Sequence, residues 1–288
     1  MKTILIPVDF SDHSVSTYKY AIRIAGTSAK TRLYFQHSYN DLIIVPDSGL
    51  NSGFDNETYI NMQLVEEFRK QAETNMKKLK EEVENYLTQN NLSNFKIETA
   101  VTGGEPSWEI TNLCKEIIPQ FIVMGTQGNG KNEIFEGSMA KKIMNKAITP
   151  VIAVPIGEFF HDELRIMYAS NNHERDYSKI QLLIKMFENI PTKIFVVHFH
   201  FEGSGDKNLQ LITELKEAFA TVENKHLNFS IIDTADKENA LESFVDENDI
   251  NSIAFIAHKS NFFKSLFKET ISKHDFFKLG LPMIALHE

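Results

Sequence analysis

A glycine-rich loop carries the clearest chemical signal in the sequence. Gly125 and Gly128 are separated by two residues, and eight residues later Gly137 and Ser138 open a lysine-containing segment. Glycines let main-chain amides approach an anion closely, and a helix that begins at Ser138 would add unpaired N–H groups with a partial positive charge. The spacing therefore predicts a phosphate-binding loop.

A different phosphate motif overlaps this loop but lacks one of its functional groups. Gly125, Gly130 and Lys131 match most of a Walker A loop. The next residue is Asn132, which lacks the hydroxyl group that holds Mg²⁺ in that motif. The helical pattern also begins some six residues too late. We therefore favour a phosphate loop of another kind.

Two histidines near the end of a strand are the best candidates for a metal site. His198 and His200 alternate along one face of the strand, but no cysteine or third ligand lies at a suitable spacing. His37 ends the corresponding strand earlier in the chain. This correspondence indicates a repeated structural feature rather than a metal ligand.

The elements that must position the loop alternate between apolar strands and amphipathic helices. Residues 40–62 show no clear periodicity and are expected to form a loop. The apolar runs predict strands at 3–8, 32–38, 95–103, 120–125 and 150–156, and helical spacing predicts helices at 11–26, 63–90, 106–118 and 138–147. This alternation predicts a parallel, doubly wound sheet with ligands at the carboxyl ends of its strands.

The second half of the chain repeats this pattern more weakly. PVIAV at 150–154 corresponds to PMIAL at 282–286, and ILIPVD at 4–9 corresponds to RIMYAS at 165–170. The two copies of the first strand lie farther apart along the chain than the two copies of the last strand. The second copy is therefore shorter than the first. We assign the difference to the 40–62 loop. We infer an internal duplication, with domains at 1–156 and 157–288.

Composition excludes several classes of function. The net charge is −9, which argues against a general binder of nucleic acid or acidic membranes. The single cysteine, Cys114, excludes an intrachain disulfide and fits a reducing compartment. The apolar run near the N-terminus is too short for a signal peptide, and no apolar run long enough to span a membrane follows it. We expect a cytoplasmic protein.

In these motifs the chain resembles a tandem universal stress protein. IPVDFSD at the start, VTGGEP after the third strand, and MGTQG, GSMAKKI and TPVIAVP in order match the pattern of that family. The resemblance implies two Rossmann-like domains, similar to adenine nucleotide alpha hydrolases, and binding of ATP or another adenine nucleotide such as AMP, with Mg²⁺. It also implies that the two last strands pair with each other as an internal pseudo-dimer. Whether two chains dimerise further is left open.

The resemblance also implies which residues contact the nucleotide. Asp9 would contact the ribose or adenine, the backbones of Val8 and Ser38 would flank the adenine, and the glycine loop would hold the phosphates. The full expected set is Pro7, Val8, Asp9, Ser38, Met124, Gly125, Thr126, Gln127, Gly128, Asn129, Gly137, Ser138 and Met139.

Two departures from the family pattern concern the phosphate loop. The family places nine residues between the second and third glycines, and this chain places eight. In the second half, the spacing that relates the two last strands replaces the loop residues by Ala257, Ser260, Glu269 and Thr270. A carboxylate at Glu269 would repel phosphate, so we expect the second copy not to bind ATP.

Three functional hypotheses follow. The first is a nucleotide-binding sensor or regulator in a stress response, without an identifiable catalytic base. The second is a nucleotide-free interaction protein that docks an unknown protein partner, with the 40–62 loop as a candidate surface. The third is an ATPase of low turnover.

Overall fold

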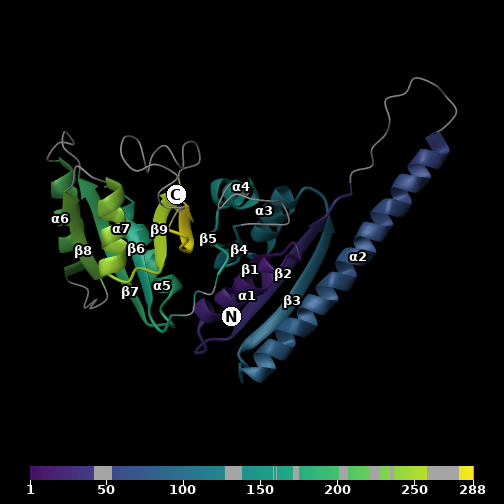
Figure 1. The fold of residues 1–288 in the computed structure, drawn as a ribbon, viewed down its shortest axis with the longest axis horizontal. Coiled ribbons are helices and arrows are strands. Elements are labelled where there is room, and N and C mark those ends of the chain that lie inside the picture. The colour runs from purple at the N-terminus through teal and green to yellow at the C-terminus, as the bar shows by residue number, and fades with distance from the viewer. Residues whose placement is uncertain are drawn as a thin grey trace.

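Strands and helices alternate along the chain (Figure 1). The computed structural model describes residues 1–41, 54–126, 138–157, 159, 161–170, 175–200, 207–220, 227–233, 237–257 and 279–287. Its strands are β1 (Lys2–Pro7), β2 (Thr31–Tyr39), β3 (Phe95–Gly103), β4 (Phe121–Gly125), β5 (Val151–Val154), β6 (Leu164–Ala169), β7 (Thr192–His200), β8 (Leu227–Asp233), β9 (Ser252–Ala257) and β10 (Met283–His287). Its helices are α1 (His13–Ala25), α2 (Phe54–Gln89), α3 (Pro106–Ile117), α4 (Ser138–Lys146), α5 (Asp176–Met186), α6 (Lys207–Ala220) and α7 (Lys237–Glu247).

The described strands form a single sheet. Its order is β3-β2-β1-β4-β5-β10-β9-β6-β7-β8, and neighbours are parallel everywhere except between β5 and β10. Central strands such as β1, β5 and β9 are buried along their length, which explains why they read as continuous apolar runs rather than alternating patterns. The predicted doubly wound α/β fold is confirmed.

The antiparallel pair at the middle of the sheet has local two-fold symmetry. Ile152 of β5 lies directly opposite Ile284 of β10, and these two isoleucines occupy the same place in PVIAV and PMIAL. On either side of them, Ala153 lies opposite Met283 and Val151 lies opposite Ala285. The predicted pairing of the last strands is confirmed.

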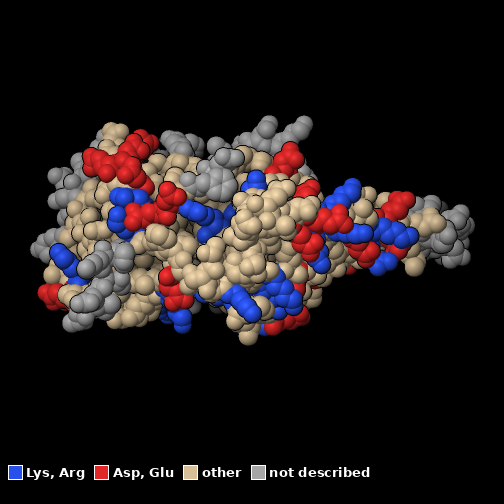
Figure 2. Space-filling model, turned by 90° about the horizontal axis from the view of Figure 1, so that it is seen from below, with Lys and Arg blue, Asp and Glu red and all other residues tan. Residues whose placement is uncertain are grey.

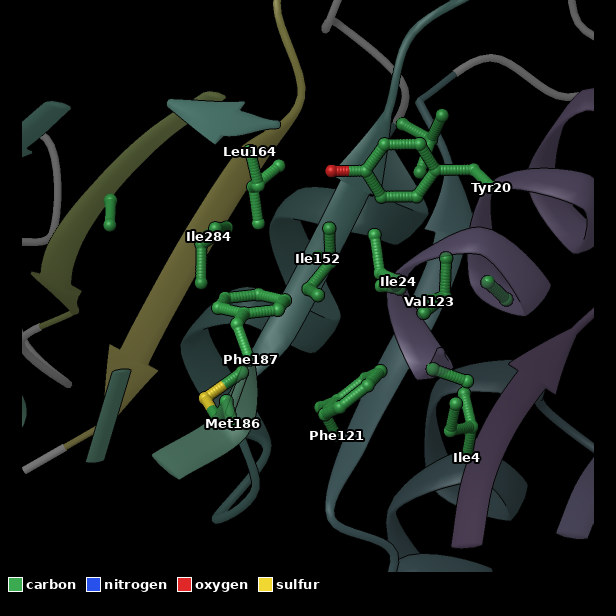
Figure 3. Close-up of a cluster of buried hydrophobic side chains, with 14 of the residues drawn as sticks. Ile4, Tyr20, Ile24, Phe121, Val123, Ile152, Leu164, Met186, Phe187 and Ile284 are labelled. Atoms are coloured by element: carbon green, nitrogen blue, oxygen red, sulfur yellow. The ribbon is translucent and has the colours of Figure 1, made fainter. Parts of the chain in front are cut away.

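Apolar side chains from both halves share the same hydrophobic core. One buried cluster lies on the face covered by α1, α2, α5 and α6, and a second lies on the face covered by α3, α4 and α7. Figure 3 shows the first cluster at the join, where Phe121 of β4 lies close to Phe187, which follows α5. Their ring centroids are 6.3 Å apart. An ion pair of 3.3 Å between Lys2 and Glu188 also joins the halves.

Helix α2 corrects the prediction of a loop over 40–62. The helix begins at Phe54, and residues 42–53 of that range lie outside the described residues. Its first part projects from the body (Figure 1), so no continuous apolar stripe is needed there, and periodicity cannot detect it. Ion pairs within the helix, such as Arg69 with Glu66 and Glu73, stabilise this exposed part instead.

Helix α2 accounts for part of the length difference between the two copies. It has 36 residues, whereas α6, in the corresponding place after β7, has 14 described residues. Residues 54–62, which were predicted to belong to a loop, are part of this helix. Helices α5 and α7 complete the repeated pattern, although their individual positions were not predicted.

The symmetric pair at the join predicts a measurable contribution to stability. Replacing Ile284 by Ala would leave a cavity opposite Ile152 and should lower the free energy of unfolding by about 2–4 kcal/mol. Urea denaturation followed by circular dichroism measures this change. Ile156→Ala is the matched control, since Ile156 is exposed and its loss should change stability by less than about 0.5 kcal/mol. Equal effects of the two substitutions would contradict the importance of the join.

Candidate functional site

A pocket of about 250 Å³ opens at the carboxyl ends of β1, β2 and β4. The first turns of α1, α3 and α4 form the rest of its wall. Eight residues of the predicted set line it, namely Pro7, Val8, Asp9, Ser38, Met124, Gly125, Thr126 and Met139. Position at this edge is expected for ligand sites in doubly wound sheets.

Five residues of the predicted set cannot be placed in this pocket. Gln127, Gly128, Asn129 and Gly137 lie outside the described residues. Ser138 is the first residue of α4, and its side chain is likewise outside them. The amide of Thr126, where the predicted loop begins, donates to the Val154 carbonyl at 3.0 Å. That amide therefore belongs to the sheet rather than to a phosphate cradle.

The turn after β1 is held by hydrogen bonds to Asp9. The carboxylate oxygen Oδ1 accepts from the amide of Ser11 at 3.1 Å and from its hydroxyl group at 2.6 Å. Phe10, between them, has a φ of 59°, a left-handed conformation that is uncommon for a bulky residue. Helix α1 begins at His13, with Asp12 at its N-cap and no side-chain cap hydrogen bond.

His37 connects β2 to the end of β1. Its Nδ1 lies 2.8 Å from the Val8 carbonyl oxygen, and since a carbonyl only accepts, Nδ1 carries the proton. Its ring also packs on Phe10, with centroids 4.3 Å apart. Burial lowers the pKa of His37 below its usual 6.5, although the bond to Val8 and the charge of Asp9 oppose this shift. The imidazole is therefore mainly neutral at pH 7.

The Val8 backbone is already engaged within the protein. Its amide donates to the Gln36 carbonyl at 2.8 Å, and its carbonyl accepts from His37. The resemblance implied that this backbone would flank the adenine. Its carbonyl retains one lone pair for a ligand, whereas its amide proton does not remain available.

Several polar residues of the pocket were missed by sequence reasoning. Gln36 is buried, and its amide nitrogen donates to the hydroxyl groups of Ser38 at 2.6 Å and Thr102 at 3.2 Å. Thr17 is also buried and donates to the His13 carbonyl at 2.8 Å. The available signal for Gln36 was a glutamine directly after the apolar residues Leu33, Tyr34 and Phe35 of a predicted strand. The full set of additional lining residues is Ser11, His13, Ser14, Thr17, Gln36, His37, Pro106, Ile110 and Ala140.

An ion pair joins α3 and α4 beside the pocket. Glu105 is the N-cap of α3, where its carboxylate accepts from the Trp108 amide at 2.9 Å and the Ser107 hydroxyl at 2.5 Å. It also contacts Lys142 of α4 at 3.0 Å. The bond from Ser107, followed by that from Lys142, lowers the pKa of Glu105 to about 2. Lys142, a cation near the predicted phosphate loop, thus has an anionic partner within the protein.

The second half carries the same histidine contact at the equivalent position. The amide of Val8 donates to the Gln36 carbonyl, and the amide of Ser170 donates to the Val197 carbonyl. Ser170 is therefore the counterpart of Val8. His198, which follows Val197 as His37 follows Gln36, is the counterpart of His37. His198 Nδ1 lies 3.0 Å from the Ser170 carbonyl oxygen. The interpretation of these histidines as a repeated feature is confirmed.

The rest of the second-half position differs chemically from the first. Asp176 is buried and accepts from the hydroxyl groups of Tyr168 at 2.7 Å and Ser170 at 2.5 Å. Burial, and then the charge of Asp176, raises the pKa of Tyr168 well above its usual value. A buried carboxylate in this place would oppose a bound phosphate.

Strand register also corrects the predicted counterpart of Gly125. Gly125 lies opposite Val154 in the first half, and Ile256 lies opposite Leu286, the counterpart of Val154, in the second. Ile256 rather than Ala257 therefore matches Gly125. Ser260, Glu269 and Thr270 lie outside the described residues.

Neither a membrane span nor a metal cluster is found in the part of the chain that the structure describes. No described helix is both long enough and apolar enough to cross a bilayer. No group of three or more His, Cys, Asp or Glu side chains is placed there to hold a metal ion, and the side chain of His200 lies outside the described set. Lys, Arg, Asp and Glu side chains are interspersed over the face shown in Figure 2.

The sequence and the fold match those of a known class of α/β proteins. The profile of the Universal stress protein family matches residues 1–155, and the chain belongs to that family. A universal stress protein of Methanocaldococcus jannaschii is 29% identical over 156 residues, which cover 53% of this chain and 81% of the relative. One of Bacillus subtilis is 24% identical over 151 residues, covering 52% of this chain and 96% of the relative.

A solved structure extends the similarity in fold to the whole chain. The crystal structure of a universal stress protein from Archaeoglobus fulgidus aligns with 99% of this chain and 96% of its own, with a TM-score of 0.57 and 14% identity. At that identity the match concerns the fold alone.

The ion pair beside the pocket predicts a pH-dependent effect on stability. The pKa of Glu105 is about 2 in the folded protein, below its usual 4.5, so its stabilising contribution is present above pH 4.5 and is lost as the pH falls toward 2. At pH 7, Glu105→Gln should lower the midpoint of thermal unfolding by about 2 °C. This deficit relative to the parent should shrink as the pH approaches 2. Glu116→Gln, an exposed change on the same helix, is the control, and a deficit independent of pH would contradict the assignment.

Proposed function

We propose that the first half of the chain binds an adenine nucleotide, with ATP as the expected ligand. The protein would act as a sensor or regulator in a cytoplasmic stress response rather than as an enzyme. The observation that carries this proposal is that the residues expected to contact a nucleotide lie together. The family match covers residues 1–155, and within it eight residues expected to contact a nucleotide line one pocket at the carboxyl edge of the sheet.

The chemistry of the pocket suits a nucleobase. A planar base has two apolar faces and a polar edge, and the lining offers apolar side chains from Val8, Ile110 and Met124. The Ser38 hydroxyl, which accepts from Gln36, can donate its own proton to the edge. The volume of about 250 Å³ is small for a complete nucleotide, since pockets for ligands of that size span about 300–1,000 Å³. The phosphates would therefore extend over the glycine loop at 127–137.

The organisation of the chain follows from the same proposal. Domains at 1–156 and 157–288 would form an internal pseudo-dimer, of which the first binds the nucleotide. The buried Asp176 supports a structural role for the equivalent position in the second half. Mg²⁺ would accompany the phosphates of ATP, neutralising charge rather than binding to a cluster of protein carboxylates.

One observation favours the alternative of an interaction protein. Three large apolar side chains on α2 are exposed, with accessible fractions of 58% for Met62, 44% for Leu64 and 42% for Phe68. They lie before the part of the helix whose apolar residues are buried, from Ala72 onward. Leu64 and Phe68, four residues apart, share one face of the helix, and exposed apolar side chains on one face are a feature of docking sites.

Nucleotide titration tests the proposal directly. Trp108, the single tryptophan, is 61% exposed on the first turn of α3 beside the pocket residue Pro106, so its fluorescence should change on ATP binding. Isothermal titration calorimetry provides an independent affinity. Gly128→Glu, which adds a side chain and a negative charge to the loop, should abolish binding with little change in thermal stability. Gln89→Glu adds the same charge at an exposed site and should bind normally.

The outcomes separate the three hypotheses. Absence of ATP and AMP binding at millimolar concentration would favour the interaction protein. Release of phosphate above background by the purified protein, abolished by Gly137→Asp, would indicate an ATPase of low turnover instead. Binding without turnover supports the sensor.

A conservative change at Asp9 tests the nucleoside end of the site. Asp9→Asn keeps an oxygen that can accept from Ser11 but removes the negative charge. Loss of a charge-assisted hydrogen bond to the ribose or adenine should weaken ATP binding about tenfold. Calorimetry measures the change, and thermal unfolding within about 2 °C of the parent would show that the turn is intact. An unchanged affinity would place Asp9 outside the contact set.

A further inference from the structure

A second cavity, which shares no lining residue with the first, lies between the two halves. Its volume is about 420 Å³. Helix α1 and the end of α2 form one side, and the start of β6, the turn before β7 and the start of β9 form the other. The volume falls within the range of about 300–1,000 Å³ that is usual for small-molecule sites. We call it the seam cavity.

Aromatic side chains form the apolar wall of the seam cavity. The rings of Tyr20 and Phe159 meet edge to face, with centroids 6.4 Å apart, and Tyr86 at the end of α2 also lines the cavity. Figure 3 shows the Tyr20 hydroxyl directed toward Leu164 of the other half. These rings would accept the flat or apolar body of a ligand.

The Tyr20 hydroxyl makes a hydrogen bond across the seam to Ser252. It lies 3.4 Å from the Ser252 hydroxyl, which donates its own proton to the Asn251 carbonyl at 2.7 Å. Tyr20 must therefore act as the donor in the longer contact, which is at the limit of hydrogen-bond distance. Burial raises the pKa of Tyr20 to about 12, so the phenol keeps its proton at neutral pH.

The charges of the seam cavity favour an anion. Lys19 and Arg23 lie one turn apart on α1, and Asp162 is the one carboxylate in the described lining. Asp162 is fully exposed and contacts Arg23 at 3.3 Å, whereas the Lys19 ammonium group lies 5.4 Å from the centre of the Tyr86 ring. The lining thus carries more positive than negative charge, in a protein whose net charge is −9.

We propose that the seam cavity binds a small organic anion with an aromatic or apolar body. Its carboxylate or sulfonate group would face Lys19 and Arg23, and its body would pack on Tyr20, Tyr86 and Phe159. The ligand would contact both halves of the chain at once. This site is separate from the nucleotide pocket and does not depend on the function proposed for it.

Calorimetric titration with 2-naphthoate tests the seam cavity, with neutral 2-naphthol as the matched probe. The parent protein should bind naphthoate at millimolar concentration or below, and should bind naphthol more weakly. Lys19→Gln should weaken naphthoate binding about tenfold and leave naphthol unchanged, since it removes a charge but little volume. Asn90→Trp, at an exposed lining position, should weaken both probes by filling the space. Lys30→Gln, at an exposed lysine outside the lining, is the control.

Four results would overturn the proposal. The first is absence of naphthoate binding by the parent, the second is equal binding of the two probes, and the third is binding that neither Lys19→Gln nor Asn90→Trp changes. Each variant is first checked by thermal unfolding, so that a folding defect is not mistaken for loss of the site. Displacement of naphthoate by ATP would assign the probe to the nucleotide pocket instead and likewise reject the seam cavity. Failure of ATP to bind would leave the naphthoate result unaffected.

Discussion

The antiparallel contact between β5 and β10 is the constraint on which the rest of the structure depends. Each of these strands would otherwise be an apolar edge with unpaired amides and carbonyls, a surface prone to aggregation. Pairing them converts two five-stranded sheets into one and brings Ile152 against Ile284 on a local two-fold axis. Because the strands are joined here, both layers of helices also share hydrophobic cores across the join.

This arrangement places the carboxyl ends of the two sets of strands at opposite edges of the sheet, and the two positions differ chemically. The carboxyl edge of the first half holds a pocket bounded by Val8, Asp9 and His37, whose backbone and ring contacts fix its shape. In the second half the equivalent position is occupied by hydrogen bonds among Tyr168, Ser170 and Asp176. The duplication has thus kept the scaffold, including the paired histidines, while the chemistry of the two positions has diverged.

Much of the fold and part of the site could be predicted from the sequence. Buried strands read as apolar runs, and Asp9, Ser38 and Gly125 could be placed at one edge because parallel strands share it. The start of α2 could not be predicted, since residues 54–62 show no clear apolar periodicity in the sequence. Gln36 and Thr17 were missed because their role depends on which elements pack against them, and that information is tertiary.

The projecting part of α2 has a consequence for solution measurements. A helix of 36 residues is about 54 Å long, and Figure 1 shows much of it extending beyond the body. Frictional drag rises with such asymmetry, so a single chain will diffuse more slowly than a sphere of the same mass. The elution volume in size-exclusion chromatography would therefore overstate the mass and suggest a dimer. Light scattering and sedimentation equilibrium measure the molecular mass independently of shape.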